Sequence, residues 1–559
     1  MKKTLLTTLA TLAVVLTHGA KPAKEIIYRP HPQEWGALVE GAAFEDRIEP
    51  MQGAKIATKR MWGADGVRGR YIDNGIEDKR ISFWGGNIVQ DEEGKYHLFV
   101  CGWAEDNPKG HFGYPTSTVY HATCANSVGP FEVVETMGEG HNPEIFRAKD
   151  GTWMVYHVTS HPDKFDLTKN LNYFRSKSLN GPWELCHLEL DLRDREIRLG
   201  GGTWFHNMTF APREDGSVIM LSRMGSIWIS ETGESPYHLV TERSIYPLVS
   251  GKYEDPVIWR DEVQYNAIVN DWIGRTAFYL RSRDGVNWIQ EEGTAYTPGV
   301  ARHEDGYVEE WTKYERVRIL QDERGRAIQM NLAVIDTLKN EDLPNDRYSS
   351  KNISLPLNRG MLLSLVDKKP IARTAKMIEV RIEGEVDFDP LKEVDVNTLR
   401  LGSSSEVNFG RGAEPISSRA EGADLIVSFA NINACIAVDE FALKVIGKRT
   451  GGEMLFGYLR LPWVEFLTPI VSARKPVVEN GGASIVVENF GQVSSEPTVL
   501  TVSDFMEGTE REISSVVVPA IEPYGSVTLQ LEVEDMTPRD VVVRVLSRIG
   551  APSVFATQL

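Results

Sequence analysis

The stretch GEGHNPEIFRAKDGTWMVYH, residues 138–157, contains two strand-like runs joined by an Asp-Gly turn. The first run opens with His141-Asn142-Pro143-Glu144, four residues that do not favour strand interiors. The stretch has two interpretations. It is either a loop that ends where the strand begins, or a strand whose first residues point into a shared polar cavity.

The pattern of this stretch occurs five times in the first 360 residues. The five starts are Trp84-Gly-Gly-Asn-Ile-Val, His141-Asn-Pro-Glu-Ile-Phe, His206-Asn-Met-Thr-Phe-Ala, Glu254-Asp-Pro-Val-Ile-Trp and Glu315-Arg-Val-Arg-Ile-Leu. A polar turn and a second apolar strand follow each start, and four repeats add a tight turn with an aromatic residue, as in SKSLNGPWE at 176–184. Repeats of about 50 residues with four short strands each are typical of propeller blades. The sequence therefore predicts an all-β chain that begins with a five-bladed β-propeller.

In a propeller, the first strand of each blade lies beside the central axis, and its opening residues face the axial cavity. His141 and Asn142 are then one fifth of a ring, which explains a strand that opens with polar residues. Loops between the second and third strands of each blade rise on the same face. The predicted substrate-binding residues are Trp84, Trp103, His111, His141, Asn142, His206, Asn207, Asp271, Trp311 and Arg316.

This ring predicts a carbohydrate ligand, because aromatic faces stack on sugar C–H surfaces and charged groups hydrogen-bond to hydroxyls. Two carboxyl groups across a cavity perform glycoside hydrolysis when one stays ionised and the other is kept protonated. Asp255, Glu254 and Glu315 are the candidates. No cofactor is required and no dedicated metal ligands are predicted, although calcium held by the axial carboxylates stays open.

The starts HNPEIFRAKDGTW and YEDPVIW, the NGPWE outer strand and the start YERVRIL resemble five-bladed glycoside hydrolases of families 43, 32, 68 and 117. The resemblance covers residues 60–360 and implies removal of terminal sugars, in family 117 from red-algal oligosaccharides. Relatives of the family-43 type place the Asp that acts as catalytic base at the start of the first strand of the first blade. This chain has Trp84-Gly85-Gly86-Asn87 there. Asp255 matches the Asp of that Asp-Pro pattern, but in the fourth blade.

The resemblance also bears on the other catalytic candidates. Glu254 and Glu315 lie one residue earlier in the frame, where some relatives keep an acid, and family 117 uses a histidine as acid. His303 is the candidate for that role by its place between the fourth and fifth blades. Either Asp73 or Asp78 supplies the missing base, or the mechanism differs.

The rest of the chain carries no motif that implies chemistry. Apolar and polar residues alternate in two further segments, which predicts a β-sandwich domain at 373–470 and an immunoglobulin-like β-sandwich at 471–559 after a propeller at 24–360. Scaffold, oligomer contact and glycan binding are open roles for both. Two lysines, an apolar run and small residues predict a signal peptide at 1–23, and hence export to the periplasm or the cell exterior.

Composition limits the partners. Among 559 residues the formal net charge is −18, which argues against a nucleic-acid partner, and no later stretch is apolar enough to cross a membrane. The oligomeric state stays unknown, and the four cysteines leave open whether Cys101 and Cys124 form a disulfide.

The sequence supports three hypotheses. The leading one is an exported exo-acting glycoside hydrolase that removes a terminal sugar from an algal or plant polysaccharide fragment. The second is a polysaccharide lyase on a uronate, with Arg316 or Arg275 as the clamp, because the first blade lacks its Asp. The third is a non-catalytic glycan-binding propeller, which the same gap supports.

Overall fold

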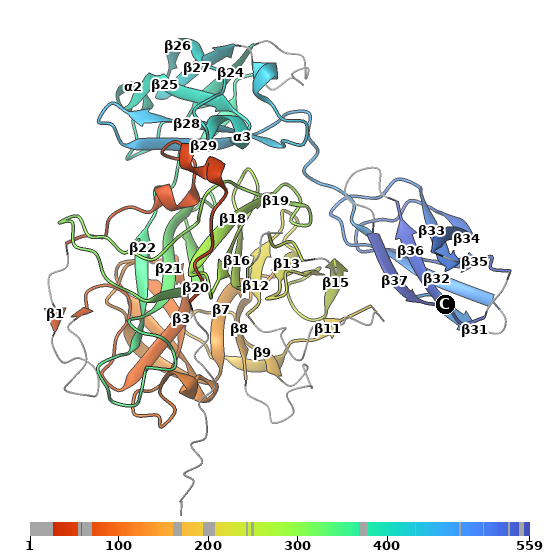
Figure 1. Ribbon diagram of the computed structural model, residues 1–559, viewed down its shortest axis with the longest axis horizontal. Coiled ribbons are helices and arrows are strands. Elements are labelled where there is room, and N and C mark those ends of the chain that lie inside the picture. Colours follow the sequence, from red (N-terminus) through yellow and green to blue (C-terminus); the bar gives the residue numbers. More distant parts are fainter. Residues whose placement is uncertain are drawn as a thin grey trace, which may run out of the picture.

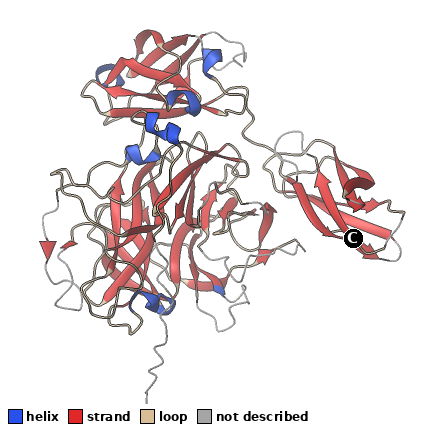
Figure 2. Cartoon of the chain, viewed as in Figure 1, coloured by secondary structure: helices blue, strands red, loops and turns tan. Residues whose placement is uncertain are grey.

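A computed structural model of the protein describes residues 26–53, 57–58, 70–159, 170–193, 207–241, 244–247, 251–367, 377–430, 432–479, 482–506, 508–534, 537–546 and 553–559. The described chain is all-β, with short helices only (Figures 1 and 2). The expected signal peptide at 1–23 and His206 lie outside the described residues. Within the described part, no helix has the length and apolar character needed to cross a membrane.

Residues 81–356 contain five successive sheets in which neighbouring strands along the chain pair antiparallel. The first two sheets are β3 (Ile81–Gln90), β4 (Tyr96–Ala104), β5 (Thr118–Cys124), β6 (Glu132–Glu139), and β7 (His141–Arg147), β8 (Trp153–Val158), β9 (Leu171–Ser176), β10 (Glu184–His187). The third is β12 (Thr209–Pro212), β13 (Val218–Leu221), β14 (Ile227–Ser230) and β15 (Tyr237–Thr241), extended by β11 (Leu190–Asp191). The last two are β16 (Tyr253–Arg260), β17 (Tyr265–Asp271), β18 (Thr276–Ser282), β19 (Trp288–Gln290), and β20 (Lys313–Gln321), β21 (Ala327–Ile335), β22 (Ser350–Pro356).

The first strands of the five sheets contact one another in a closed cycle. β3 contacts β7, β7 contacts β12, β12 contacts β16, β16 contacts β20, and β20 contacts β3. Apolar side chains fill the spaces between neighbouring sheets. Phe146 of β7, for example, stacks on Phe210 of β12 with ring centroids 4.2 Å apart. The opening residues of all five first strands therefore face one axis.

The fifth sheet has three strands, where the repeat predicts four. A segment that precedes the first sheet in the chain covers the outer edge of this fifth sheet, at β22. The Asn74 side chain acts as a strand neighbour: its Nδ2 donates to Ser354 O at 2.7 Å, and its Oδ1 accepts from Ser354 N at 2.8 Å. Gly75 has φ +76°, and a Cβ there would lie 1.7 Å from Asn352 O, so only glycine fits.

The remaining strands form four sheets over two hydrophobic cores. Between 363 and 460 these are β23 (Leu363–Leu365), β24 (Met377–Ile382), β27 (Asp424–Ala430), β26 (Pro415–Glu421), and β25 (Val394–Gly402), β28 (Ala442–Arg449), β29 (Met454–Arg460). From 471 they are β30 (Val471–Ala473), β32 (Gly482–Asn489), β31 (Val477–Glu479), β35 (Ser526–Leu531), and β34 (Thr509–Val518), β33 (Thr498–Met506), β36 (Asp540–Val545), β37 (Ser553–Gln558). The two cores share no residue. The domain boundaries expected from the sequence stay predictions.

Short elements complete the described chain. They are η1 (Gln33–Ala37), η2 (Phe44–Arg47), β1 (Ala57–Thr58), β2 (Arg70–Tyr71), η3 (Gly110–Thr116), α2 (Pro390–Glu393), α3 (Ser404–Val407) and η4 (Ile432–Cys435). Cys101 and Cys124, like the other two cysteines, are not disulfide-bonded.

Candidate active site

The second residue of each repeat start has a left-handed backbone. The φ angles are +58° at Gly85, +58° at Asn142, +66° at Asn207, +55° at Asp255 and +55° at Arg316. In β3, β7, β16 and β20 the strand register shifts at this position. A bulge of this kind re-aims a side chain, and the left-handed conformation costs a residue with a Cβ about 1–2 kcal/mol. The repeated strain marks five equivalent positions around the axis.

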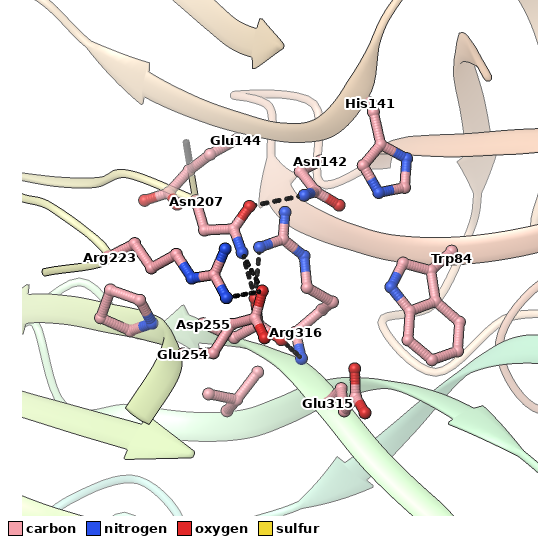
Figure 3. A network of polar contacts seen from close by, with 12 residues as sticks. Trp84, His141, Asn142, Glu144, Asn207, Arg223, Glu254, Asp255, Glu315 and Arg316 are labelled. Atoms are coloured by element: carbon pink, nitrogen blue, oxygen red, sulfur yellow. Dashed lines mark hydrogen bonds and ion pairs between the residues drawn. The ribbon is translucent and has the colours of Figure 1, made fainter. Parts of the chain in front are cut away.

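The side chains at four of these positions form one hydrogen-bonded chain (Figure 3). Asn142 Nδ2 donates to Asn207 Oδ1 at 2.7 Å, and Asn207 Nδ2 donates to Asp255 Oδ1 at 2.8 Å. Arg316 Nη1 donates to the same Asp255 oxygen at 2.6 Å. Each side chain is at least nine-tenths buried. The structure thus brings together residues that are far apart in the sequence, as the ring interpretation expects.

The remaining position is Gly85 in the first sheet, and its neighbour Arg316 explains why it is a glycine. A Cβ on Gly85 would lie 3.3 Å from Arg316 Cβ and 3.5 Å from Arg316 Nε. The Arg316 side chain therefore occupies the space that a side chain at position 85 would need. Asp78 accepts from Arg80 N at 2.7 Å and from Arg80 Nε at 3.5 Å.

The neighbouring carboxyls Glu254 and Asp255 differ in their ionisation. Burial raises the pKa of Glu254 to about 7, and the Asp255 charge adds to this, against the opposing charge of Arg223. Glu254 Oε1 accepts from Asn207 Nδ2 at 3.0 Å and lies 3.1 Å from Arg223 Nη2. Burial also acts to raise the pKa of Asp255, but the charge and hydrogen bond of Arg316 outweigh it and lower that pKa. One carboxyl is poised to hold a proton while its neighbour stays ionised.

Glu315 is held by two lysines. Its Oε2 lies 2.5 Å from Lys339 Nζ, and its Oε1 lies 3.4 Å from Lys313 Nζ. The Lys339 ammonium also sits 4.8 Å from the centroid of the Trp84 ring, and Lys313 sits 4.7 Å from that of Trp272. Each oxygen of the Glu315 carboxyl group therefore lies beside a lysine side chain.

Two predicted histidines lie beside this network. His141 is partly exposed, with Nδ1 3.0 Å from Ser117 Oγ and 3.4 Å from Cys101 Sγ. His111 is buried edge-on against Trp84 and Trp103, with centroids 4.8 and 5.1 Å apart. Burial lowers the pKa of His111 well below its usual value, so this imidazole is neutral.

The three predicted tryptophans are packing residues. Trp84 and Trp103 are 3% and 2% exposed in a cluster with Cys101, and Trp311 is 7% exposed in the core between the fourth and fifth sheets. Their faces are therefore covered by protein and do not provide an open platform for a sugar. The partly exposed Trp272 is the more accessible indole.

Two further predicted residues make contacts outside the network. Asp271 is fully buried and accepts from Arg29 Nε at 2.6 Å and from Lys252 N at 3.0 Å. These bonds tie the end of β17 to the segments that contain Arg29 and Lys252. His303 Nε2 lies 2.8 Å from Glu309 Oε1, and its Nδ1 lies 3.0 Å from Gln52 O. Both ring nitrogens are used, so the expected acid role of His303 does not fit its contacts.

The sequence analysis missed Arg223, Lys313 and Lys339. Arg223 lies in the β13–β14 loop and Lys339 in the β21–β22 loop. The rule that loops between second and third strands rise on the axial face finds both, once it is applied to the third and fifth repeats. Lys313 opens β20, two residues before Glu315.

The site has no feature of a metal centre. In the described part of the chain, no three His, Cys, Asp or Glu residues are grouped so that they could hold a metal ion. Asp255, Glu254 and Glu315 each already face a cationic side chain. The calcium site left open by the sequence does not fit these residues.

Comparison with known proteins gives weak similarities. No protein-family model matches the chain, and no curated protein sequence matches it. Among solved structures, the chain is similar to an α-L-arabinofuranosidase from Lactobacillus brevis, with 12% identity, 49% of this chain and 90% of that chain covered, and a TM-score of 0.32. It is also similar to a thermostable family-43 glycoside hydrolase (12%, 55% and 94%, 0.31) and to a family-43 protein from Bacillus licheniformis (10%, 87% and 90%, 0.32).

The solved structures that resemble this chain thus include family-43 glycoside hydrolases, the group that the repeat starts suggest. At TM-scores below 0.5 these similarities establish neither the fold nor the activity. Both are therefore inferred from the residues of this chain.

Proposed function

We propose that the protein is an exported glycoside hydrolase with a five-bladed β-propeller, followed by two β-sandwich domains, that removes a terminal sugar from an algal or plant polysaccharide fragment. The closed cycle of five first strands supports the propeller. The alternating pattern of the C-terminal sheets over two separate cores supports the sandwiches. The signal-like N-terminus supports export.

The observation that carries the proposal is that the pKa values of two adjacent carboxyl groups, Glu254 and Asp255, are shifted in opposite directions. Glycoside hydrolysis needs an acid that is protonated near neutral pH and a carboxylate that is not. Burial and the Asp255 charge raise the pKa of Glu254 to about 7, whereas Arg316 keeps Asp255 ionised. Glu254 is also the more exposed of the two, at 19% against 2% of its side chain.

These properties assign separate roles. Glu254 donates its proton to the glycosidic oxygen as the bond from the sugar's C1 to that oxygen breaks. Glu315, which lies beside Lys339 and Lys313, stabilises the positive charge that develops on the sugar or accepts a proton from the attacking water. Asp255 is a positioning residue, because it acts through the proton of Glu254.

The same network supports an exo mode. Side chains from β7, β12, β16 and β20 bond to one another, and Arg316 fills the space beside Gly85 of β3. The described side chains therefore fill the space between these first strands. Because these side chains occupy the axis, a long polysaccharide cannot thread through it, and a substrate that binds by its end is favoured.

The test is release of a monosaccharide from a panel of neutral, acidic and sulfated oligosaccharides. We expect one class to yield a single sugar from its end, and Glu254→Gln to abolish the release while the exposed-surface variant Glu231→Gln does not. Products that are unsaturated and absorb in the ultraviolet would show elimination and overturn hydrolysis.

A glycan-binding propeller without turnover is the second candidate. The pairing of Asp255 with Arg316 and of Glu315 with Lys339 favours it, because a paired carboxylate is a weaker base. Calorimetric binding of an oligosaccharide with no product after long incubation would select this candidate.

A further inference from the structure

The axial network contains more positive than negative side chains. The ionisable groups within it are Glu254, Asp255, Glu315, Arg223, Lys313, Arg316 and Lys339. Three acids face four bases, and when Glu254 holds its catalytic proton only two acids remain charged. The whole chain has a net charge of −18, so a positive surplus at this point is contrary to the general composition.

The surplus is concentrated at Glu315. Two lysines, Lys339 with Nζ at 2.5 Å and Lys313 with Nζ at 3.4 Å, share this one carboxylate. Burial lowers the pKa of Lys313, which also donates to Trp272 O at 2.9 Å. Burial acts to lower the pKa of Lys339, but the charges of Glu315 and Glu254 outweigh it and raise that pKa, so Lys339 is charged. Lys339 is also the more open of the two lysines, with 25% of its side chain exposed against 7%.

The buried arginine adds to the surplus. Arg316 gives Asp255 one of its guanidinium nitrogens at 2.6 Å and is 2% exposed. Its Nε and Nη2 have no hydrogen-bond partner among the residues that the structure describes. A buried cation with unsatisfied donors is costly until an acceptor is supplied.

A sugar hydroxyl cannot neutralise this charge, whereas a carboxylate or a sulfate ester neutralises it and offers several acceptors. We propose that the sugar bound at this site carries an anionic substituent, a uronate carboxylate or a sulfate ester, and that Lys339 and Arg223 recognise it. This inference rests on the proposed function, for which it names the substrate class.

The experiment uses matched pairs of oligosaccharides. Uronate-containing oligosaccharides are compared with the same material after reduction of their carboxyl groups, and sulfated oligosaccharides with their desulfated forms. We expect kcat/KM to be at least tenfold higher for one anionic member than for its neutral partner. We also expect that advantage to shrink as NaCl is raised, because salt screens charges that are not fully buried. The two pairs distinguish carboxylate from sulfate.

Variants of Lys339 test the residue itself. Lys339→Met should lower the anionic-to-neutral ratio of kcat/KM at least tenfold, and Lys339→Arg, which keeps the charge, should preserve most of it. Lys177→Met is the matched control, because Lys177 pairs with the exposed Asp150 at 2.5 Å and lies in the turn after β9. Since both substrates are measured on one preparation, loss of folded protein cancels in the ratio.

The outcomes separate this inference from the proposed function. Equal or better turnover of the neutral partner overturns the anionic substituent and leaves the hydrolase proposal standing. Binding of the anionic member to wild type without turnover supports the charge recognition and overturns hydrolysis. If the wild type neither binds nor cleaves any member, both proposals fail.

Discussion

Two glutamates of this protein, the partly exposed Glu254 and the buried Glu309, show how neighbours decide what a carboxyl can do. Glu254 lies beside Asp255, a like charge. Glu309 lies 2.8 Å from His303 Nε2 and accepts from Trp311 Nε1 at 2.8 Å. Burial acts to raise the pKa of both. The pKa of Glu254 rises to about 7, whereas the hydrogen bond from His303 and the charge of Lys351 lower that of Glu309.

The difference separates chemistry from structure. A carboxyl that shares a buried site with another acid keeps its proton near neutral pH and can give it to a substrate. A carboxyl with two donors of its own is satisfied in the ionised form and serves to hold its surroundings. Four experiments test this contrast.

The largest effect is expected from removing the proton of Glu254. Glu254→Gln should lower kcat by about 10²–10⁴-fold, the usual contribution of a general acid, with little change in melting temperature. Glu309→Gln is the matched variant and should leave kcat unchanged while lowering the melting temperature. Steady-state assays with thermal melts check both, and equal losses of kcat would remove the distinction between the two glutamates.

Breaking the ion pair between Asp255 and Arg316 should mainly reduce stability. Arg316→Met leaves Asp255 buried without its cation, which costs about 3–5 kcal/mol. The double variant Arg316→Met with Asp255→Asn should melt higher than Arg316→Met alone, because no unpaired charge remains. A double variant that melts as low as the single one would show that Arg316 acts through packing rather than charge.

The pH dependence of activity should shift in opposite directions for two neighbours of Glu254. A general acid loses activity as pH rises through its pKa. Asp255→Asn removes a charge that raises the pKa of Glu254, so the alkaline limb should move to lower pH, on the order of one unit. Arg223→Met removes a charge that lowers it, so the limb should move to higher pH. Shifts of the same sign in kcat profiles would contradict Glu254 as the titrating acid.

The smallest effect is expected at His303. Glu309 raises the pKa of His303 by a hydrogen bond. The resulting stabilisation is complete below the unfolded pKa of about 6.5 and is lost as pH rises through the higher folded pKa. His303→Asn should therefore cost about 1 kcal/mol at pH 6 and less at pH 9, with kcat unchanged. A loss of kcat that exceeds the loss of folded protein would restore the acid role suggested by the resemblance.

The sequence repeat located the first strand of each of the five sheets, although β3 begins three residues before Trp84. β3, β7, β16 and β20 contain the predicted opening residues, and β12 begins two residues after Asn207. The pattern can be recognised because each repeat contains the same three features: a polar start, a tight turn and an apolar second strand. The contacts at the edge of the fifth sheet could not be predicted from the repeat. Asn74 and Gly75 make them with Ser354 and Asn352, which lie 280 and 277 positions further along the chain.

Within the site, residue type and frame pointed to Asn142, Asn207, Asp255 and Arg316, which the structure joins. Position within the repeat did not separate exposed from buried aromatic residues. It therefore assigned Trp84 and Trp103 to sugar binding, whereas in the structure the two rings pack against each other. Burial depends on which neighbours the fold supplies, and these neighbours come from β21 as well as β4.

The sequence alone determined that five similar segments each present a polar pair at the start of a strand, because local periodicity and turn residues are encoded within each segment. Tertiary structure decided the ionisation of those pairs. The charge state of Glu254 depends on Asp255, Arg223 and Lys339, which three different sheets bring together, and electrostatic interactions between them exist only once the sheets close around one axis.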